Sequence, residues 1–316
     1  MSRMILTLIL AILVLAGVAT FLFWPGARDE VETAPGDVAA IPDTPYWGDA
    51  DRWVMVEGVR ARVRIEGPEE GPVVVMVHGF SFSLETWDRW AADLATDYRV
   101  IRMDLPGHAL TGPDPQARYS VDQTVDFLEQ LMQGLGIEQA SLVGNSLGGL
   151  VSWKLAARRP DLVEKLVLLS PGGFSINGVT EDPVPVPVGV SFYLTQAPQP
   201  MIAAATTGLF GDASRMPDGM AQRVGDMMRF DGVGQALVER LEVFTLPDPT
   251  ASLTAVEADT LILWGENDRM VPPEHGPQFA ALIPTARLVS LPGLGHIPHE
   301  EDPAGTIGDV RAFLAN

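Results

Sequence analysis

The chain has 316 residues, of which 47% are hydrophobic and 20% charged, and this is enough apolar material for at least one large folded domain. The 41 acidic residues against 21 basic ones give a net charge of −20, which repels polyanions and excludes nucleic acid as an expected partner. Because the chain has no cysteine, disulfides, thiolate metal sites and cysteine nucleophiles are excluded as well.

The N-terminal segment is apolar and is expected to cross a membrane. Residues 4–24 contain no charged side chain, and a helix of this length reaches roughly the 30 Å thickness of a hydrocarbon core. A basic residue precedes this run and a net negative charge follows it, which favours a cytoplasmic N-terminus and a body outside the cytoplasm. Residues 1–24 are therefore predicted to be a transmembrane signal-anchor, with a periplasmic body if the organism is bacterial. The alternative is a signal peptide whose cleavage after Ala19 releases a secreted protein.

Residues 25–51 combine prolines, glycines and acidic residues without a helical or strand period, and this composition predicts a tether. From residue 53 onwards, short runs rich in Val, Ile and Leu alternate with amphipathic stretches, which is typical of a mostly parallel sheet with crossover helices. Eight strands are predicted, at residues 53–57, 60–66, 73–77, 99–104, 140–143, 165–169, 260–264 and 287–291. Five helices are predicted between them, at residues 84–94, 121–135, 147–159, 273–282 and 304–314. The expected fold class is α/β, with an eight-stranded sheet flanked by helices.

One interval, residues 173–255, departs from this alternation. It has no convincing buried strand, prolines at 183, 185 and 187 interrupt it, and helical patterns follow. We expect an inserted helical cap or lid that divides the α/β core into a first part, residues 52–172, and a second part, residues 256–316. The methionine and aromatic side chains of this interval are expected to form mainly its own core, with some of them lining a cleft.

The sequence G-N-S-L-G-G at residues 144–149 carries the strongest chemical signal. It directly follows a predicted strand and leads into a predicted helix, which is the context of the nucleophile elbow G-x-S-x-G. So sharp a turn strains its middle residue and leaves no room for side chains two positions before and after it, hence Gly144 and Gly148 around Asn145 and Ser146. Ser146 is predicted to be the nucleophile, at the positive end of the following helix.

A serine hydroxyl needs a neighbouring base and a carboxylate that orients the base. Asp268 follows one predicted strand and His296 follows another, so both are expected at the carboxyl ends of strands, where open α/β sheets place their sites. The chain order Ser146, Asp268, His296 is the order of the triads that use such an elbow. The oxyanion hole is assigned to the backbone N–H groups of Phe80, in the turn after an earlier strand, and of Leu147.

Two of these assignments have a rival nearby: Glu266 for the acid and His299 for the base. His296 is favoured because it lies in a Gly-rich loop that can reach the serine, whereas His299 follows Pro298 and opens an acidic helix start. The run from His296 to Glu301 contains metal-ligand types, but its proline interrupts the H-E-x-x-H pattern of a zinc helix. No P-loop or dinucleotide fingerprint is present. No metal and no cofactor are therefore expected.

Further motifs surround these residues: HGF at 78–80, DLPGH at 104–108, WGENDRMVPP at 264–273 and GLGHIPHEEDP at 293–303. From about residue 53 to the end, the chain resembles α/β-hydrolase fold proteins of the esterase and lipase group with a helical cap. It is also similar to the C–C bond hydrolases that act on meta-cleavage products of aromatic rings. The resemblance implies that Asp268, rather than Glu266, is the triad acid. Ala109 departs from a glycine common in the second motif, and the serine at the elbow argues against haloalkane dehalogenases and epoxide hydrolases, which carry an aspartate there.

The expected function is a membrane-anchored serine hydrolase that cleaves hydrophobic carboxylic esters, as carboxylesterases and lipases do, through an acyl-enzyme on Ser146. Its expected partners are a hydrophobic ester and the membrane that holds the N-terminal helix. One alternative is a C–C bond hydrolase with the same triad, which needs a cation of the cap for the substrate carboxylate: Arg215, Arg223 or Arg229. The other is a non-catalytic binding protein on the same fold. The natural ester, its acyl-chain length and the oligomeric state stay open.

Overall fold

The computed structural model describes residues 43–316. The predicted anchor, residues 1–24, and most of the predicted tether lie outside the described residues. No helix within residues 43–316 has the length and apolar character needed to cross a bilayer.

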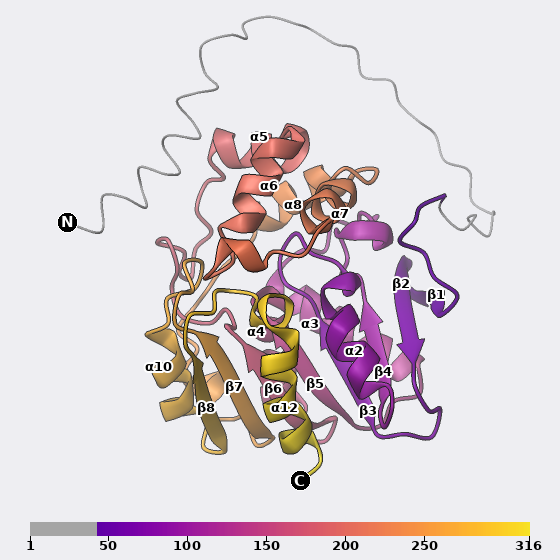
Figure 1. Cartoon of the computed structure of the whole chain (residues 1–316), viewed down its shortest axis with the longest axis vertical. Helices are drawn as coiled ribbons and strands as arrows, with labels where there is room; N and C mark the ends of the chain where they lie inside the picture. The colour runs from indigo at the N-terminus through magenta and orange to yellow at the C-terminus, as the bar shows by residue number, and fades with distance from the viewer. Residues whose placement is uncertain (1–42) are drawn as a thin grey trace, which may run out of the picture.

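An eight-stranded, mostly parallel sheet forms the centre of the described chain (Figure 1), which confirms the predicted sheet. The strands are β1 (Asp51–Val56), β2 (Val59–Glu66), β3 (Val73–Val77), β4 (Arg99–Met103), β5 (Ala140–Asn145), β6 (Val163–Leu169), β7 (Asp259–Gly265) and β8 (Ala286–Leu291). Their spatial order is β1-β2-β4-β3-β5-β6-β7-β8. β1 and β2 form an antiparallel hairpin, β2 is antiparallel to β4, and the other pairings are parallel. The carboxyl ends of β3 to β8 therefore meet at one end of the sheet.

Side chains of the buried strands pack on two helical layers, because successive residues of a strand face opposite sides. Val75 and Val77 of β3 pack in one core, and Val74 and Met76 of the same strand pack in the other. The first layer contains α3 (Val121–Gly134), α4 (Leu147–Arg158) and α10 (His275–Leu282), and the second contains α2 (Asp88–Leu94) and α12 (Pro303–Leu314). Burial on both faces explains the nearly continuous runs of Val, Ile and Leu in these strands.

Short turns complete the core and shift two predicted boundaries. The predicted helix at residues 84–94 is divided into a 3-10 turn, η1 (Leu84–Trp87), and α2, and α10 begins at His275 rather than at residue 273. The first turn is held from outside, since Leu84 N donates to Asp104 Oδ1 at 2.8 Å. The remaining turns are η2 (Ala109–Thr111), α9 (Thr250–Leu253) and α11 (Pro298–Glu301).

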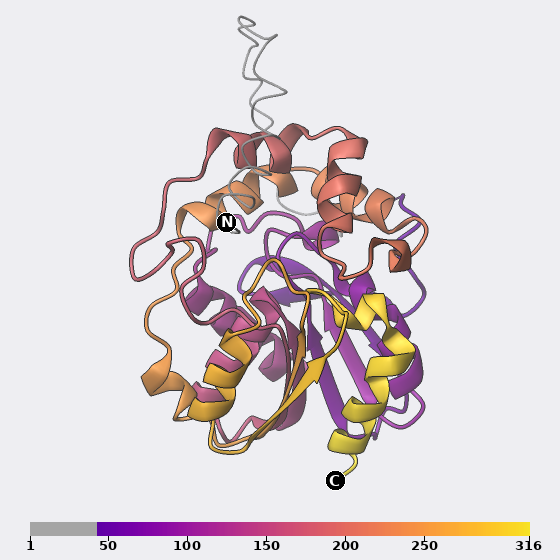
Figure 2. The ribbon, with the colours of Figure 1, turned by 60° about the vertical axis from the view of Figure 1, so that its left-hand side comes forward.

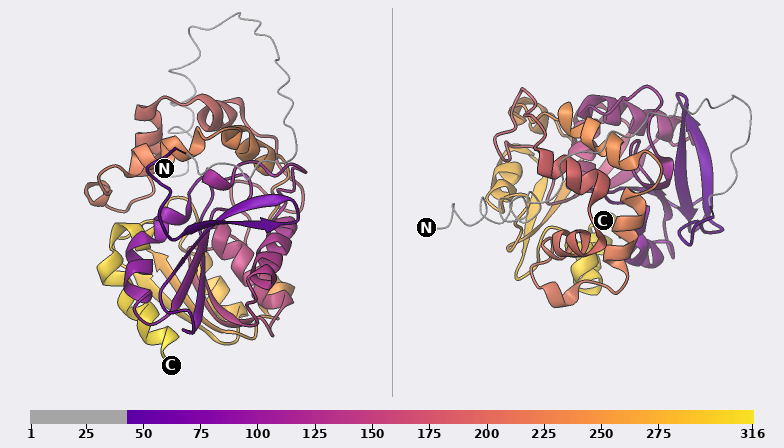
Figure 3. Two further views of the ribbon diagram at one scale, coloured as in Figure 1. Left: turned by 90° about the vertical axis from the view of Figure 1, so that its right-hand side faces the viewer. Right: turned by 90° about the horizontal axis from the view of Figure 1, so that it is seen from above.

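Between β6 and β7 the chain forms a group of helices that we call the helical insertion. Its members are α5 (Val188–Gln196), α6 (Gln199–Thr207), η3 (Ala213–Arg215), α7 (Met220–Met228) and α8 (Val233–Glu242). Figures 1 and 2 show them together at the end of the molecule opposite the C-terminus, and the right-hand view of Figure 3 shows them from above. Their apolar core packs against Phe80 and Phe82, which follow β3, and against Ile297. The insertion thus lies over the carboxyl ends of the strands, and its action as a lid stays a prediction.

A buried arginine attaches the helical insertion to the core. Arg240 of α8 donates from Nη1 to Tyr119 O at 3.0 Å and to Thr124 Oγ1 at 2.8 Å, and from Nη2 to Pro106 O at 2.8 Å. All three acceptors are neutral, and burial lowers the pKa of Arg240 to about 10. These bonds fix the insertion to the chain between β4 and α3.

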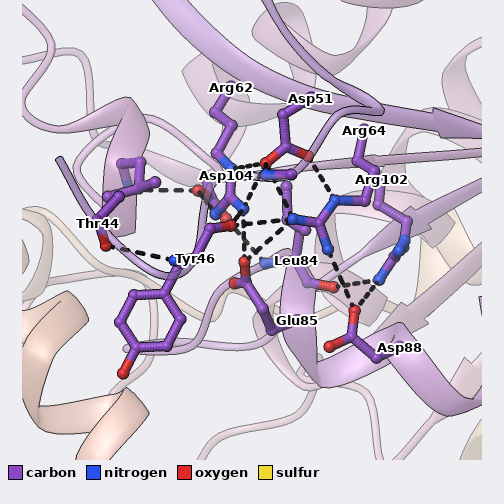
Figure 4. Close-up of polar contacts among 12 residues, drawn as sticks. Thr44, Tyr46, Asp51, Arg62, Arg64, Leu84, Glu85, Asp88, Arg102 and Asp104 are labelled. Atoms are coloured by element: carbon purple, nitrogen blue, oxygen red, sulfur yellow. Dashed lines mark hydrogen bonds and ion pairs between the residues drawn. The ribbon is translucent and has the colours of Figure 1, made fainter. Parts of the chain in front are cut away.

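A second buried arginine holds the antiparallel end of the sheet (Figure 4). Arg62 of β2 lies among three carboxylates: its Nη2 is 2.8 Å from Asp51 Oδ2 and 2.6 Å from Glu85 Oε1, and its Nη1 is 3.2 Å from Asp104 Oδ2. Burial raises the pKa of Asp104 to about 6. Burial acts in the same direction on the pKa of Glu85, but the charge of Arg62 outweighs it and the pKa is lowered. The cluster ties the loop after β4 and the turn η1 to the first hairpin.

Candidate active site

Ser146 lies at the turn between β5 and α4, and its backbone has φ 54° and ψ −114°. Residues with a side chain rarely adopt a positive φ, so this turn is strained and depends on its surroundings. Ser146 N donates to Leu169 O at 3.0 Å, and Gly172 N donates to Ser146 O at 3.0 Å, which fixes both sides of the turn. β5 runs on to Asn145, two residues beyond its predicted end, and thus reaches the serine directly.

Close packing requires the glycines on either side of the serine. A Cβ on Gly148 would overlap the carbonyl groups of Val77 and His78, and a Cβ on Gly144 would overlap the backbone of Gly148. Without side chains at these positions, α4 begins against the end of β3. Its first backbone amides therefore lie beside Ser146, at the positive end of the helix.

The structure joins two of the predicted triad residues by a hydrogen bond. His296 Nδ1 lies 2.8 Å from Asp268 Oδ2, and both side chains are buried. Asp268 Oδ1 accepts from Met270 N at 2.8 Å and from Val271 N at 2.9 Å. Burial alone would raise the pKa of Asp268, but His296 and these hydrogen bonds hold it below the usual value. An ionised carboxylate accepts the Nδ1–H of the imidazole and leaves Nε2 available as a base.

Asn145 connects the serine turn to the histidine loop. Its Nδ2 donates to Leu169 O at 3.0 Å and to His296 O at 3.1 Å, so the residue before the serine holds the backbone of the histidine. No hydrogen bond involves Ser146 Oγ within residues 43–316, and the serine is half-buried. Asp268 and His296 are thus in direct contact, and the turn of Ser146 is joined to the histidine loop through Asn145.

The two rival residues are placed elsewhere. Glu266 is exposed, and only its backbone is fixed, by a bond from its N to Leu291 O at 3.1 Å. His299 is buried, its Nε2 lies 3.0 Å from Thr86 Oγ1, and its ring stacks on Trp87 with centroids 4.2 Å apart. Burial lowers the pKa of His299 to about 3. A neutral, stacked imidazole of this kind supports the packing of α11 on η1.

The two amides predicted for the oxyanion hole flank the serine. A Cβ on Gly79 would lie 3.3 Å from Ser146 Cβ, so the turn that carries Phe80 N passes directly over the serine. Neither Phe80 N nor Leu147 N donates to another group within residues 43–316. His78 braces this turn, because its Nε2 accepts from Leu105 N at 3.0 Å and its Nδ1 donates to Gly79 O at 2.8 Å. Burial lowers the pKa of His78 to about 4, which keeps the ring neutral.

A buried carboxylate that sequence analysis did not assign holds the histidine loop. Glu301 Oε2 accepts from Gly295 N at 2.8 Å and from Gly211 N at 2.9 Å, and Glu301 Oε1 accepts from Asp212 N at 2.8 Å. A Cβ on Gly295 or on Gly211 would overlap the backbone of the opposite segment. His296 N itself donates to the carbonyl oxygen of residue 209, at 2.8 Å. The helical insertion and the loop of the predicted base are therefore bonded into one unit.

The helical insertion gives the site an apolar border but no free cation. Phe210, Met220 and Met228 are buried in the insertion's own core, as expected for most of its methionine and aromatic side chains. The three candidate cations are engaged elsewhere in the described chain. Arg223 Nη2 lies 2.5 Å from Glu300 Oε1, Arg229 donates to Gln199 Oε1 and Ala197 O, and Arg215 faces Asp212 and Asp302.

Two cavities lie apart from the predicted triad. One, of about 480 Å³, is lined by Tyr46, Arg64 and Arg223 among others, and another, of about 460 Å³, by Phe174 and Leu246 among others. Neither is lined by a predicted triad residue. Within residues 43–316, no group of three or more His, Asp or Glu side chains is placed to hold a metal ion.

Comparison with known proteins identifies the family. A family model described as the alpha/beta hydrolase fold matches residues 72–303. The chain belongs to the α/β-hydrolase fold family. This α/β-hydrolase is 32% identical over 290 aligned residues to an uncharacterized protein of Mycobacterium tuberculosis, covering 82% of this chain and 79% of that protein. It is 28% identical over 269 residues to a 2-hydroxy-6-oxononadienedioate/2-hydroxy-6-oxononatrienedioate hydrolase of Comamonas testosteroni, covering 81% of this chain and 92% of that protein.

A solved structure shows the same fold. The α/β-hydrolase is similar to a membrane phospholipase A described as a bacterial virulence factor, with a TM-score of 0.70 and 23% sequence identity. The match covers 84% of this chain and 85% of that one.

Proposed function

We propose that this α/β-hydrolase is a membrane-anchored serine hydrolase that cleaves hydrophobic carboxylic esters through an acyl-enzyme. The observation that carries the proposal is the buried pair of Asp268 and His296, 2.8 Å apart, whose histidine loop is bonded through Asn145 to the strained turn of Ser146. A carboxylate that fixes the tautomer of an imidazole is the arrangement that activates a serine hydroxyl once the imidazole comes within hydrogen-bond reach of it.

In the proposed reaction, His296 Nε2 removes the proton of Ser146 Oγ while the serine oxygen attacks the ester carbonyl carbon. Asp268 keeps the other proton on Nδ1 and stabilises the imidazolium that forms. The amides of Phe80 and Leu147 donate to the developing oxyanion. The alcohol leaves with the proton from His296, and a water molecule that His296 deprotonates then hydrolyses the acyl-enzyme.

A fluorophosphonate probe and a series of p-nitrophenyl esters test the proposal. The probe should label Ser146, Ser146→Ala should lose both labelling and esterase turnover, and longer apolar acyl chains should be preferred to charged or sugar-like acids. Ser290→Ala is the matched control because Ser290 is exposed on β8, and it should keep both signals. Labelling that persists in Ser146→Ala would refute the assignment. An unlabelled wild-type protein would favour the non-catalytic alternative.

The second candidate is C–C bond hydrolysis of ring-cleavage products, favoured by the relative from Comamonas testosteroni, whose name states such a substrate. That chemistry would need a cation for the substrate carboxylate. Ester cleavage is the primary proposal because Arg215, Arg223 and Arg229 are occupied by other partners. Turnover of a 2-hydroxy-6-oxo-dienoate faster than that of any ester in the series would reverse the order of the two candidates.

The membrane anchor is the other part of the proposal, and its support is the uncharged run at residues 4–24. The full chain should remain in membranes at alkaline pH, and protease added outside the cytoplasmic membrane should reach the hydrolase body. Release by alkaline washing, together with a mature N-terminus near residue 20, would favour the secreted alternative.

A further inference from the structure

Helix α5 of the helical insertion is apolar and yet largely exposed. Leu194 is its only buried residue, although no residue of α5 is charged. Val188 is 86% exposed and Phe192 is 43% exposed, and because they are four residues apart they lie on the same face of the helix. Val184, in the segment before α5, is 37% exposed. We call the surface formed by Val188 and Phe192 the α5 face.

The α5 face belongs to a long uncharged stretch of an acidic protein. Residues 183–211 contain no Asp, Glu, Lys or Arg, whereas 20% of the whole chain is charged and its net charge is −20. Burial in the insertion accounts for members of this stretch such as Leu194 and Ile202, but not for the exposed side chains of the α5 face. Apolar side chains exposed together without charge are typical of a surface that meets an apolar partner.

The position of the α5 face relates it to the membrane. Figures 1 and 2 show α5 at the end of the molecule opposite the C-terminus. The first described residues enter the fold beside the same insertion, since Tyr46 Oη donates to Asp226 Oδ2 of α7 at 2.8 Å. If residues 1–24 span a bilayer, the intervening residues 25–42 extend at most about 60 Å, so the insertion lies within reach of the surface.

We propose that the α5 face docks the helical insertion onto a zwitterionic lipid surface beside the chain's own membrane anchor. The docking rests on the anchor part of the proposed function. Two exposed apolar side chains bind a bilayer weakly, but a tether raises the effective concentration of the surface, so docking occurs in the anchored chain. Zwitterionic lipid is the partner because the net charge of −20 repels anionic headgroups and the uncharged α5 face offers them no cation.

The cysteine-free sequence allows a direct test with single labels on the full chain. Val188→Cys carries an environment-sensitive fluorophore, and the protein is inserted into phosphatidylcholine vesicles that contain a lipid with a nitroxide at a shallow acyl position. Met55→Cys is the matched control, because Met55 is also apolar and is 64% exposed, on the outer strand β1. Interfacial helices lie about 5–10 Å into the headgroup boundary, so the label at 188 should be quenched at least about threefold more than the label at 55.

Each result supports the docking proposal or overturns it. Adding Phe192→Ser to Val188→Cys should abolish most of the quenching difference, and equal quenching at both positions would overturn the proposal. If the difference in quenching between the two labels disappears when the vesicles hold on average fewer than one chain each, the α5 face contacts a second copy of the chain instead of lipid. If the fluorescence of the label at 188 is shifted to the blue but is not quenched by the nitroxide lipid, the α5 face is covered by residues 1–42 of the same chain instead of lipid. Retention in vesicles and ester turnover are measured in the same sample: retention without quenching refutes docking alone, whereas release from the vesicles refutes the anchor and docking together.

Discussion

Replacing Glu301 by Gln tests whether one buried carboxylate positions the histidine loop against the helical insertion. The carboxylate accepts three backbone N–H groups, from Gly211, Asp212 and Gly295, and Gly295 immediately precedes His296. Glutamine has the same size but only one carbonyl oxygen. That oxygen can keep the two bonds made by Oε2, and its NH2 group then faces the N–H of Asp212 as a donor opposite a donor.

The size of the effect follows from these bonds. A hydrogen bond to a charged group contributes about 1.5–3 kcal/mol and a neutral one about half of that, so losing one and weakening two lowers the free energy of unfolding by about 3–6 kcal/mol. The loop of His296 is then held by fewer contacts to the insertion. A misplacement of about 1 Å at a catalytic group costs on the order of 100-fold in rate, so we expect Glu301→Gln to lower kcat 10- to about 100-fold. KM should change little, because the apolar border of the site is unaltered.

Kinetics on a p-nitrophenyl ester, measured below the melting temperature of every variant, separate positioning from general destabilisation. Glu300→Gln is the matched control, since Glu300 is the adjacent buried carboxylate and binds the Arg223 side chain of the insertion at 2.5 Å rather than the histidine loop. It should lower the melting temperature and keep kcat within about threefold of wild type, because the loop amides keep their acceptor. If Glu301→Gln lost stability but kept the kcat of Glu300→Gln, the positioning role would be refuted.

Three further predictions concern acid, charge and pH. Asp268→Asn should lower kcat on the order of 10⁴-fold with the fold retained, because an amide favours the wrong imidazole tautomer. A kcat within tenfold of wild type, with an unchanged near-UV circular dichroism spectrum, would contradict the orienting role of Asp268. Burial lowers the pKa of His78 to about 4 and that of His299 to about 3, whereas a histidine of the unfolded chain has a pKa of ~6.5. The packing of these two neutral rings therefore stabilises the fold fully above about pH 6.5, and this stabilisation is lost as the pH falls towards 4. Urea unfolding between pH 7 and about pH 4.5 should show up to about 1.4 kcal/mol lost per pH unit for each histidine, and a slope that His299→Gln leaves unchanged would count against this cause. Arg62→Met should lower the free energy of unfolding by about 3–5 kcal/mol, more than Arg64→Met does. The reason is that Arg62 is fully buried among carboxylates, whereas Arg64 is 13% exposed. Equal losses for the two variants in denaturant titration would disprove the central role of Arg62.

The strands and the serine turn are predictable because their signals are local. A run of Val, Ile and Leu buried on both faces marks β3 or β6 wherever it lies in the sheet. Gly144 marks the turn because the clash that it avoids is with the backbone of Gly148, inside the strand-turn-helix unit itself, whereas the clash that Gly148 avoids is with the end of β3. The split of the predicted helix at residues 84–94 is different. The first turn of this helix is bound by Asp104, which directly follows the neighbouring strand β4, so the shape of the turn depends on tertiary structure.

The residues that hold the site together cannot be predicted from local signals, because their partners lie far away along the chain. Glu301 bonds to an amide 90 positions away, and Asn145 bonds to a carbonyl 151 positions away. In the sequence, Glu301 has the character of an acidic helix start and Asn145 is the unspecified residue of the elbow pattern. The role of Glu301 arises only when the helical insertion packs on the histidine loop, because the N–H groups of Gly211 and Gly295 must then find an acceptor. The role of Asn145 arises when the histidine loop packs on the serine turn. The proposed catalytic residues are therefore marked by local motifs, whereas the residues that position them are found by asking which buried amides need a partner.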